Sequence, residues 1–266
     1  MGEEGSRCME TELYERLSAG GETLRFRFIR PATHDARIPL VVMLTGDGPS
    51  GSKSLSWVNL PPRLADAGIA TLLFDFAGLG YSDGERRRLT LTKGISNFRT
   101  VYAALAEFDW IDAERIGYMG SSFGACAALL CPDILNEARA IGLKSPCAFL
   151  PDAYINEIGL EALEGWQRDG YCEANGYDFD VLLDSFGHNA YQAATQIHAS
   201  CFITHGLSDE VVPVSQSKYL SFLLAGPTEL VLFPDCDHGY SGGNWEPMAD
   251  MFVRYFAEKL TDLGVR

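Results

Sequence analysis

Short apolar segments alternate with helical patterns from residue 39 to the end of the chain, and this alternation restricts the fold more than any other feature. Residues 39–45 form a continuous apolar run, which is typical of a strand that helices cover on both faces of a sheet. The other expected strands are residues 69–75, 115–119, 140–146, 200–205 and 229–233. Helical patterns are found at residues 54–67, 91–108, 214–224 and 246–260. Strands that alternate with helices predict an α/β fold with a mostly parallel, doubly wound sheet.

Two segments depart from this alternation. Residues 11–17 and 22–30 alternate polar and apolar side chains around a glycine-containing turn, which predicts an N-terminal antiparallel hairpin. Residues 151–198 have weak periodicity and several aromatic side chains, which predicts a small inserted cap. A chain of 266 residues suits one large domain with an insertion. We therefore expect residues 1–150 and 199–266 to form the core and residues 151–198 to form the cap.

A G-x-S-x-G sequence lies where the expected strand at 115–119 meets a helix of small residues. It reads Gly120-Ser121-Ser122-Phe123-Gly124, and a strand, a tight turn and a helix are the context that a nucleophilic serine requires. Ser122 is the candidate, because a strained backbone at the nucleophile leaves no room for a Cβ two residues before or after it. Ser121 lacks glycines at those two positions.

A serine hydroxyl needs a base and a carboxylate that orients the base. The chain has five histidines, and His238 lies in a glycine-containing loop after the last strand, whereas His205 lies at a strand end and is expected to be packed or bonded to backbone. The others are His34, in a turn before the sheet, and His188 and His198, in the cap and its return. Asp209 follows the strand before His238, which gives the order Ser122, Asp209, His238 that is typical of α/β-hydrolases. Asp152, after the strand at 140–146, is an alternative acid.

The sequence resembles the α/β-hydrolase superfamily from residue 24 to the final helix. Within that superfamily it is similar to the cinnamoyl/feruloyl-esterase-like and prolyl-oligopeptidase-related serine hydrolases, which combine G-x-S-x-G with an H-G-x-x-D-x-x-V-P acid loop and a histidine loop of the D-H-x-F/Y type. Residues 205–213 match the acid loop, and residues 75–82 resemble the family's D-x-x-G-x-G-x-S loop. The resemblance implies an oxyanion hole made by the backbone N–H groups of Phe123 and Asp47.

The loop that carries Asp47 departs from the family's pattern. Thr45 stands where the family has a histidine, and Asp47 places a carboxylate beside a site that must stabilise negative charge. If the carboxylate turns outward, its backbone N–H still serves the oxyanion. If it turns inward, it opposes the oxyanion, and it could then bind a cationic group or act as an acid. The sequence leaves both orientations open.

Charge and composition exclude several classes of partner. The formal charge of −15 argues against nucleic acid and anionic membranes as partners. The basic cluster at 86–88 is expected to be a solvated loop face.

No apolar run is long enough to span a membrane. The first residues lack the pattern of a signal peptide, and the seven irregularly spaced cysteines suggest neither a disulfide framework nor a zinc site, so a reduced, cytoplasmic protein is expected.

These observations predict a serine hydrolase that cleaves a carboxylic ester through an acyl-enzyme. The expected substrate is a small acyl compound, aromatic if the cap aromatics contact it. The sequence gives no support for a metal or nucleotide cofactor, and a homo-oligomer stays open. Alternatives are a peptidase or amidase, an acyltransferase, a lactone-forming or a C–C-cleaving enzyme on the same triad, and a ligand-binding relative without activity.

Overall fold

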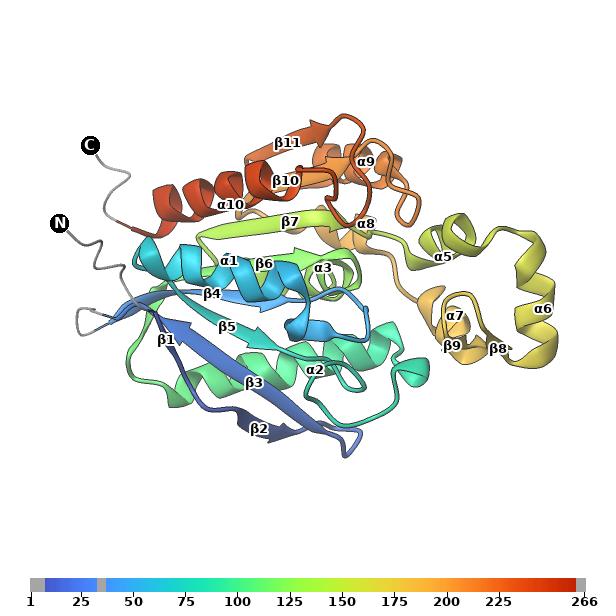
Figure 1. Cartoon of the computed structure of the whole chain (residues 1–266), viewed down its shortest axis with the longest axis horizontal. Helices are drawn as coiled ribbons and strands as arrows, with labels where there is room; N and C mark the ends of the chain where they lie inside the picture. The colour runs from blue at the N-terminus through green and yellow to red at the C-terminus, as the bar shows by residue number, and fades with distance from the viewer. Residues whose placement is uncertain (1–7, 33–36, 262–266) are drawn as a thin grey trace.

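The computed structural model describes residues 8–32 and 37–261. The first residues, on which the signal-peptide argument depends, and His34 lie outside the described residues. The described residues form a nine-stranded sheet in the order β1-β3-β5-β4-β6-β7-β10-β11, with β2 paired to β3 (Figure 1). The strands are β1 (Met9–Glu10), β2 (Tyr14–Leu17), β3 (Thr23–Arg30), β4 (Ile38–Leu44), β5 (Ala70–Phe74), β6 (Ile111–Ser121), β7 (Ala140–Pro146), β10 (Ser200–Gly206) and β11 (Thr228–Phe233).

The six strands from β5 to β11 are parallel, and β3 joins them in the antiparallel sense. The predicted N-terminal hairpin is present as β2 and β3, and β1 adds a second antiparallel partner to β3. All seven residues of β4 are buried, as its apolar sequence predicts. The mostly parallel α/β-hydrolase sheet is therefore confirmed. Its parallel register brings the carboxyl ends of β4, β6, β7 and β10 to one edge.

Helices cover both faces of this sheet (Figure 1). On one face, α1 (Leu55–Asp66) and α10 (Trp245–Leu260) lie against each other over a core that includes Trp57, Phe252 and Phe256. The second core contains Phe98, Phe123 and Leu220 from the helices of the other face. Those helices are α2 (Leu91–Ala104), α3 (Ser122–Leu129) and α9 (Val214–Leu223), and the short α4 (Pro132–Leu135) follows α3.

Two helices differ from the sequence prediction. The first, α1, continues through Pro61 and Pro62, where an irregular helix was expected, because its buried residues Leu60 and Leu64 pack against the sheet on both sides of the prolines. The second, α2, ends at Ala104 rather than at residue 108, and a short 3₁₀ turn, Leu105–Glu107, follows it. Because the helix ends earlier, the ring of Phe108 packs against Phe28 of β3.

Most of the segment between β7 and β10 extends beyond the carboxyl ends of the strands, whereas its last helix lies beside α3 and α9 (Figure 1). Its elements are α5 (Leu150–Ile158), α6 (Glu161–Asp169), β8 (Tyr171–Cys172), β9 (Tyr177–Asp178), α7 (Phe179–Ser185) and α8 (Ala190–Ala194). Trp166 and Tyr177 are buried here, and the Trp166 indole donates a 2.9 Å hydrogen bond to the carbonyl of Tyr177. The rings of Tyr154 and Phe179 pack edge-to-face against Trp166. This segment, which we call the cap, thus has an aromatic cluster of its own.

Candidate active site

Ser122 lies at the junction of β6 and α3, in a strained backbone conformation. Its φ is 50°, which is rare for a residue with a side chain. The flanking glycines have the steric reason that the sequence suggests. A Cβ on Gly120 would lie 2.6 Å from the Cα of Ala125, and one on Gly124 would overlap the carbonyl oxygen of Thr45. The strand, the turn and the helix therefore present the Ser122 hydroxyl at the carboxyl edge of the sheet.

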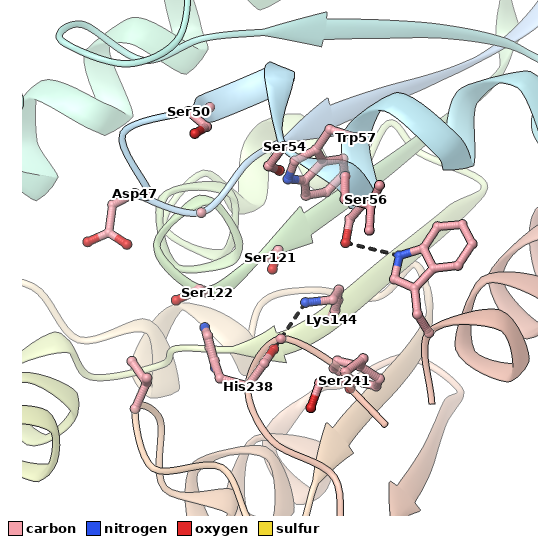
Figure 2. Close-up of a pocket in the computed structure, with 18 of the residues that line it drawn as sticks. Asp47, Ser50, Ser54, Ser56, Trp57, Ser121, Ser122, Lys144, His238 and Ser241 are labelled. Atoms are coloured by element: carbon pink, nitrogen blue, oxygen red, sulfur yellow. Dashed lines mark hydrogen bonds between the residues drawn. The ribbon is translucent and has the colours of Figure 1, made fainter. Parts of the chain in front are cut away.

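His238 comes from the loop after β11, and its ring faces Ser122 (Figure 2). Its Nδ1 lies 2.7 Å from Oδ2 of Asp209, in the loop after β10. With the proton on Nδ1 donated to that carboxylate, Nε2 is free to accept a proton from the serine. The structure thus brings together the three residues that the sequence singles out. They lie in the order Asp209, His238, Ser122 across the site.

The Asp209 carboxylate is fully buried, and both of its oxygens accept hydrogen bonds. Its Oδ1 accepts hydrogen bonds of 2.9 and 2.8 Å from the backbone N–H groups of Val211 and Val212. Burial alone would raise the pKa of Asp209, but the hydrogen bonds from His205 and His238 outweigh burial and hold that pKa well below its usual range. Asp209 is therefore ionised at neutral pH, as a carboxylate that orients an imidazole must be.

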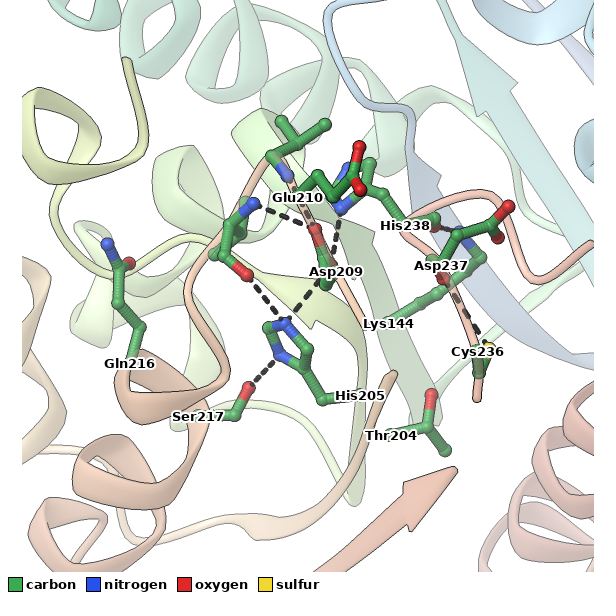
Figure 3. Close-up of polar contacts among 12 residues, drawn as sticks. Lys144, Thr204, His205, Asp209, Glu210, Gln216, Ser217, Cys236, Asp237 and His238 are labelled. Carbon is green, nitrogen blue, oxygen red and sulfur yellow. Dashed lines mark hydrogen bonds and ion pairs between the residues drawn. The ribbon is translucent and has the colours of Figure 1, made fainter. Parts of the chain in front are cut away.

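A second histidine also contacts Asp209 (Figure 3). The Nε2 of His205 lies 3.1 Å from Oδ2 of Asp209 and 3.0 Å from the carbonyl of Val212, and its Nδ1 lies 2.6 Å from Oγ of Ser217. A proton on Nε2 and a hydroxyl that donates to Nδ1 satisfy all three contacts. The sequence predicts a packed or backbone-bonded role for His205, and the structure adds the contact with Asp209.

The remaining sequence candidates lie elsewhere. The Asp152 carboxylate, the alternative acid, accepts a 2.9 Å hydrogen bond from the side-chain amide of Gln216, whereas His238 is bonded to Asp209. In the cap, Nε2 of His188 lies 2.8 Å from Oγ1 of Thr92. His198 is exposed. The geometry therefore favours Asp209 over Asp152 as the acid.

The two residues that the resemblance assigns to the oxyanion hole come from the loop after β4, for Asp47, and from the second position of α3, for Phe123. The loop after β4 passes close to the nucleophile, since a Cβ on Gly46 would lie 3.4 Å from the Cβ of Ser122. Figure 2 shows the Asp47 side chain directed away from Ser122. Its Oδ2 accepts a 2.6 Å hydrogen bond from the hydroxyl of Tyr177 in the cap. The outward orientation, one of the two that the sequence leaves open, is the one observed.

Arg86 joins the Asp47 loop to the cap. Its Nε donates a 2.7 Å hydrogen bond to the carbonyl of Asp47, and its NH1 group donates one of 2.8 Å to the carbonyl of Asn175. The guanidinium also lies 4.3 Å from the centre of the Tyr177 ring. The expectation of a solvated basic loop is therefore wrong for Arg86, although Arg87 and Arg88 are exposed. A run of three arginines carries no signal that separates the packed one from the others.

Asp75, at the end of β5, holds the two glycine-rich loops behind the site. Its carboxylate accepts hydrogen bonds of 2.6 and 2.9 Å from the N–H and the hydroxyl of Ser52, and one of 3.0 Å from the N–H of Tyr81. Gly51 and Gly80 have positive φ, and a Cβ on either would overlap this carboxylate. Burial is the main cause that raises the pKa of Asp75 above its ordinary value.

A cavity of about 740 Å³ opens beside Ser122 and His238. It extends from Glu157 in the cap to Trp245 at the start of α10. A second cavity of about 40 Å³ lies on the cap side of Ser122, and Tyr154 lines it. An aromatic substrate was expected to contact the aromatic side chains of the cap, but six of these side chains line neither cavity. Several of them instead form the cap's own cluster. The six are Trp166, Tyr171, Tyr177, Phe179, Phe186 and Tyr191.

Two ionisable residues that sequence reasoning missed also line the large cavity, Lys144 from β7 and Glu157 from α5. Burial, and then the charge of Asp47, raise the pKa of Glu157 above its ordinary value. Lys144 looked like an ordinary strand residue. The signal that could have revealed it is a charged side chain in a strand whose seven residues are all buried.

Comparison with solved structures shows that this molecule has the α/β-hydrolase fold. Est1E from Butyrivibrio proteoclasticus, in a structure with bound ferulic acid, matches 93% of this chain and 100% of its own, with a TM-score of 0.78 and 22% identity. A structure of 2,6-dihydroxy-pseudo-oxynicotine hydrolase matches with a TM-score of 0.73 and 23% identity, over 95% of this chain and 68% of its own. These similarities concern the fold.

The sequence profile of the prolyl oligopeptidase family matches residues 59–262, and the chain belongs to that family. Among curated relatives, the mouse (Mus musculus) acylamino-acid-releasing enzyme is 25% identical over 241 residues. That match covers 86% of this chain and 32% of the relative, so the chain spans about a third of that enzyme's length. The quorum-quenching protein AidA of Acinetobacter baumannii is 31% identical over 135 residues, which are 50% of this chain and 42% of AidA.

Proposed function

We propose that this protein is a serine hydrolase that cleaves carboxylic esters through an acyl-enzyme. The observation that carries the proposal is the contact between Asp209 and His238, with the His238 ring facing a serine held at positive φ. Family membership supports hydrolysis in general. The choice of an ester is supported by the likeness to Est1E, which extends over the whole of that chain, because the ferulic acid bound there is a carboxylic acid of the kind that ester cleavage releases.

In the proposed reaction, Oγ of Ser122 attacks the ester carbonyl carbon while Nε2 of His238 takes the hydroxyl proton. Collapse of the tetrahedral intermediate breaks the bond to the alcohol oxygen, which receives that proton from His238. Water then attacks the acyl-enzyme by the same route and releases the acid. Asp209 keeps the imidazole in the required tautomer and stabilises its protonated form.

The negative oxygen of the intermediate is bound by the backbone N–H groups of Asp47 and Phe123. One such donor contributes about 10²–10³ in rate in enzymes of this kind. The Tyr177 hydrogen bond supports this role, because it keeps the Asp47 carboxylate on the cap side of the loop.

The cap side of Ser122 suits a short acyl group. The cavity there has a volume of about 40 Å³, room for only a few heavy atoms. Leu150, Ala153 and Tyr154 form part of its wall, and the charged side chains of Arg86 and Glu157 also line it, so the small volume is what limits the acyl group. An acetyl or propionyl group is therefore preferred over an aromatic acyl group.

Amide hydrolysis is the second candidate. It is favoured by the family, by the likeness to the mouse acylamino-acid-releasing enzyme, and by a triad that serves both reactions. An amide has a poorer leaving group, so the two candidates differ in the relative rates on matched acetyl esters and acetyl amides. We expect the esters to react faster by a larger factor than their chemical reactivity explains.

A fluorophosphonate probe tests the proposal together with a panel of acetyl and propionyl esters. The wild-type protein is expected to be labelled at one serine and to turn over esters, and Ser122→Ala to lose both properties. Ser221→Ala, which removes a partly exposed hydroxyl from α9, is the matched control and retains both. Labelling without turnover of any ester or amide would point to acyl transfer or another reaction on the same triad. Absence of labelling would refute Ser122 as the nucleophile.

A further inference from the structure

Lys144 is a buried cation that the proposed reaction does not use. It is 7% exposed, and its Nζ donates a 3.2 Å hydrogen bond to the backbone carbonyl of His238. The ammonium also lies 4.7 Å from the centre of the Tyr240 ring. Among residues 8–32 and 37–261, no carboxylate lies within ion-pair distance of it. An ammonium has three N–H donors, and one hydrogen bond leaves donors available.

The ammonium lines the part of the large cavity between α1 and α10 (Figure 2). Neutral side chains form the other walls there: Ser54, Ser56, Trp57, Ser241 and Trp245. The carboxylates that line this cavity are Asp47 and Glu157, at its cap end, and Figure 2 shows Asp47 on the other side of Ser122 from Lys144. Hydroxyl groups and one cation therefore surround a space that holds no opposing charge.

The position of His238 decides which part of a substrate enters this space. His238 must donate its proton to the leaving oxygen, so the leaving group lies against the loop that carries His238. Lys144 lies under that loop, whereas the small cavity for the acyl group is on the cap side. The leaving group is thus the part of the substrate nearest to the ammonium.

We propose that Lys144 binds a carboxylate carried by the leaving group, so that the preferred substrates are short-chain acyl esters of hydroxy acids. This inference rests on the proposed ester hydrolysis at Ser122. In the reaction the ester C–O bond breaks, the acyl carbon bonds to Oγ of Ser122, and the alcohol oxygen takes the proton from His238. The hydroxy acid leaves with its carboxylate unchanged, so no further reactant is needed.

The cost of burying a charge supports this assignment. A buried ammonium without an ionic partner is unfavourable, and a carboxylate in the cavity would relieve that cost through charge-assisted hydrogen bonds. Burial lowers the pKa of Lys144 to about 8, although the charge of Asp209 acts in the opposite direction. At pH 7 the side chain is still mostly protonated, as an anion-binding residue must be.

The alternative is that Lys144 only supports the His238 loop through its hydrogen bond. Matched substrates separate the two roles: the acetyl esters of meta-hydroxybenzoate and lactate, each compared with the acetyl ester of the corresponding amide. The quantity measured is the ratio of kcat/KM for the acid to kcat/KM for the amide. A purely structural role changes both rates and leaves this ratio unchanged, whatever the change in absolute rate.

In the wild type we expect this ratio to be about tenfold or more, the size of one charge-assisted hydrogen bond. Lys144→Met should bring the ratio to about one, and Lys144→Arg should retain part of the preference. Lys218→Met removes the same charge from the exposed face of α9 and should keep the wild-type ratio. A wild-type ratio at or below one, or a ratio that Lys144→Met does not change, would overturn the inference.

Calorimetry on the Ser122→Ala protein tests the same point without catalysis. Free meta-hydroxybenzoate should bind about tenfold more tightly than meta-hydroxybenzamide, and adding Lys144→Met should abolish the difference. Because this measurement needs no turnover, failure of the proposed hydrolysis would not obscure it. Equal affinities for the acid and the amide would refute the Lys144 site even if Ser122 proves to be the nucleophile.

Discussion

The hydroxyl of Tyr177 donates a 2.6 Å hydrogen bond to the carboxylate of Asp47, a residue 130 positions away. The bond joins the cap to the loop that supplies one of the two proposed oxyanion donors. Arg86 reinforces the junction through the carbonyls of Asp47 and Asn175. The cap is therefore bonded to the loop that carries the proposed Asp47 donor.

Tyr177→Phe should reduce ester hydrolysis by roughly fivefold to tenfold, because it leaves the Asp47 carboxylate without its partner beside the oxyanion. The phenyl ring keeps the packing of the cap, so the melting temperature should change little. Tyr171→Phe removes a hydroxyl from a more exposed tyrosine of the cap and serves as the control. Equal rates for Tyr177→Phe and the wild type would show that the bond does not influence catalysis.

Asp47→Asn should leave the hydrolysis rate within about twofold of the wild type, because an amide oxygen can still accept the Tyr177 hydrogen bond. The charge that is removed points away from the oxyanion, so its loss brings little gain. Steady-state kinetics on an acetyl ester measures this. A large increase in kcat would mean that the carboxylate opposes the oxyanion during the reaction.

His205→Gln should lower kcat by about tenfold with little change in KM, because His205 contacts Asp209 and does not line the substrate cavity. Loss of this contact frees the Asp209 carboxylate to rotate and weakens its hold on His238. Ser217→Ala, which removes the partner of Nδ1, should have a smaller effect in the same direction. The control is His198→Gln at an exposed position. A rise in KM alone would contradict this positioning role.

Gly124→Ala should destabilise the fold by about 2 kcal/mol or more, because the added methyl group would overlap the Thr45 carbonyl. Gly165→Ala is the matched control: it lies within α6, the nearest atom to its Cβ would be 3.9 Å away, and it should stabilise by about 0.5–1 kcal/mol. Urea denaturation measures both changes. Equal stabilities for Gly124→Ala and the wild type would show that the tight turn around Ser122 can relax.

Glu22 should contribute to stability only above acidic pH. The hydrogen bond from Lys93, and next the one from Ser18, lower the pKa of Glu22 from 4.5 to about 2. A carboxyl whose pKa is lower in the folded state stabilises fully above its unfolded pKa and loses that effect as pH falls through the folded value. The difference in unfolding free energy between wild type and Glu22→Gln should thus shrink between pH 4.5 and pH 2. A difference that stays constant over this window would contradict the assignment.

The sheet, the helices and the order of the three site residues could be predicted from the sequence because each depends on local pattern. The run of apolar residues at β4 reflects burial on both faces, and the glycines around Ser122 reflect contacts made within one turn. The parallel connectivity then places the loops of Asp209 and His238 at the same edge, without any knowledge of side-chain contacts.

The other features of the site could not be predicted, because they depend on contacts between segments that lie far apart in the sequence. The orientation of Asp47 is set by Tyr177, in a cap whose sequence has little periodicity. Arg86 differs from its two neighbours only through what it meets in three dimensions. Lys144 becomes notable only when the loop after β11 covers it and a cavity opens above it. None of these relationships leaves a pattern along the chain.

The carboxylate of Asp75 has a consequence for how sequence variants of this protein are interpreted. One buried acidic group bonds both loops behind the nucleophile, so the geometry of the site and the integrity of the core depend on the same side chain. A substitution there would remove activity and folding together. A survey of variants that measures activity alone would therefore classify residue 75 as catalytic, and a survey that measures stability alone would classify it as structural.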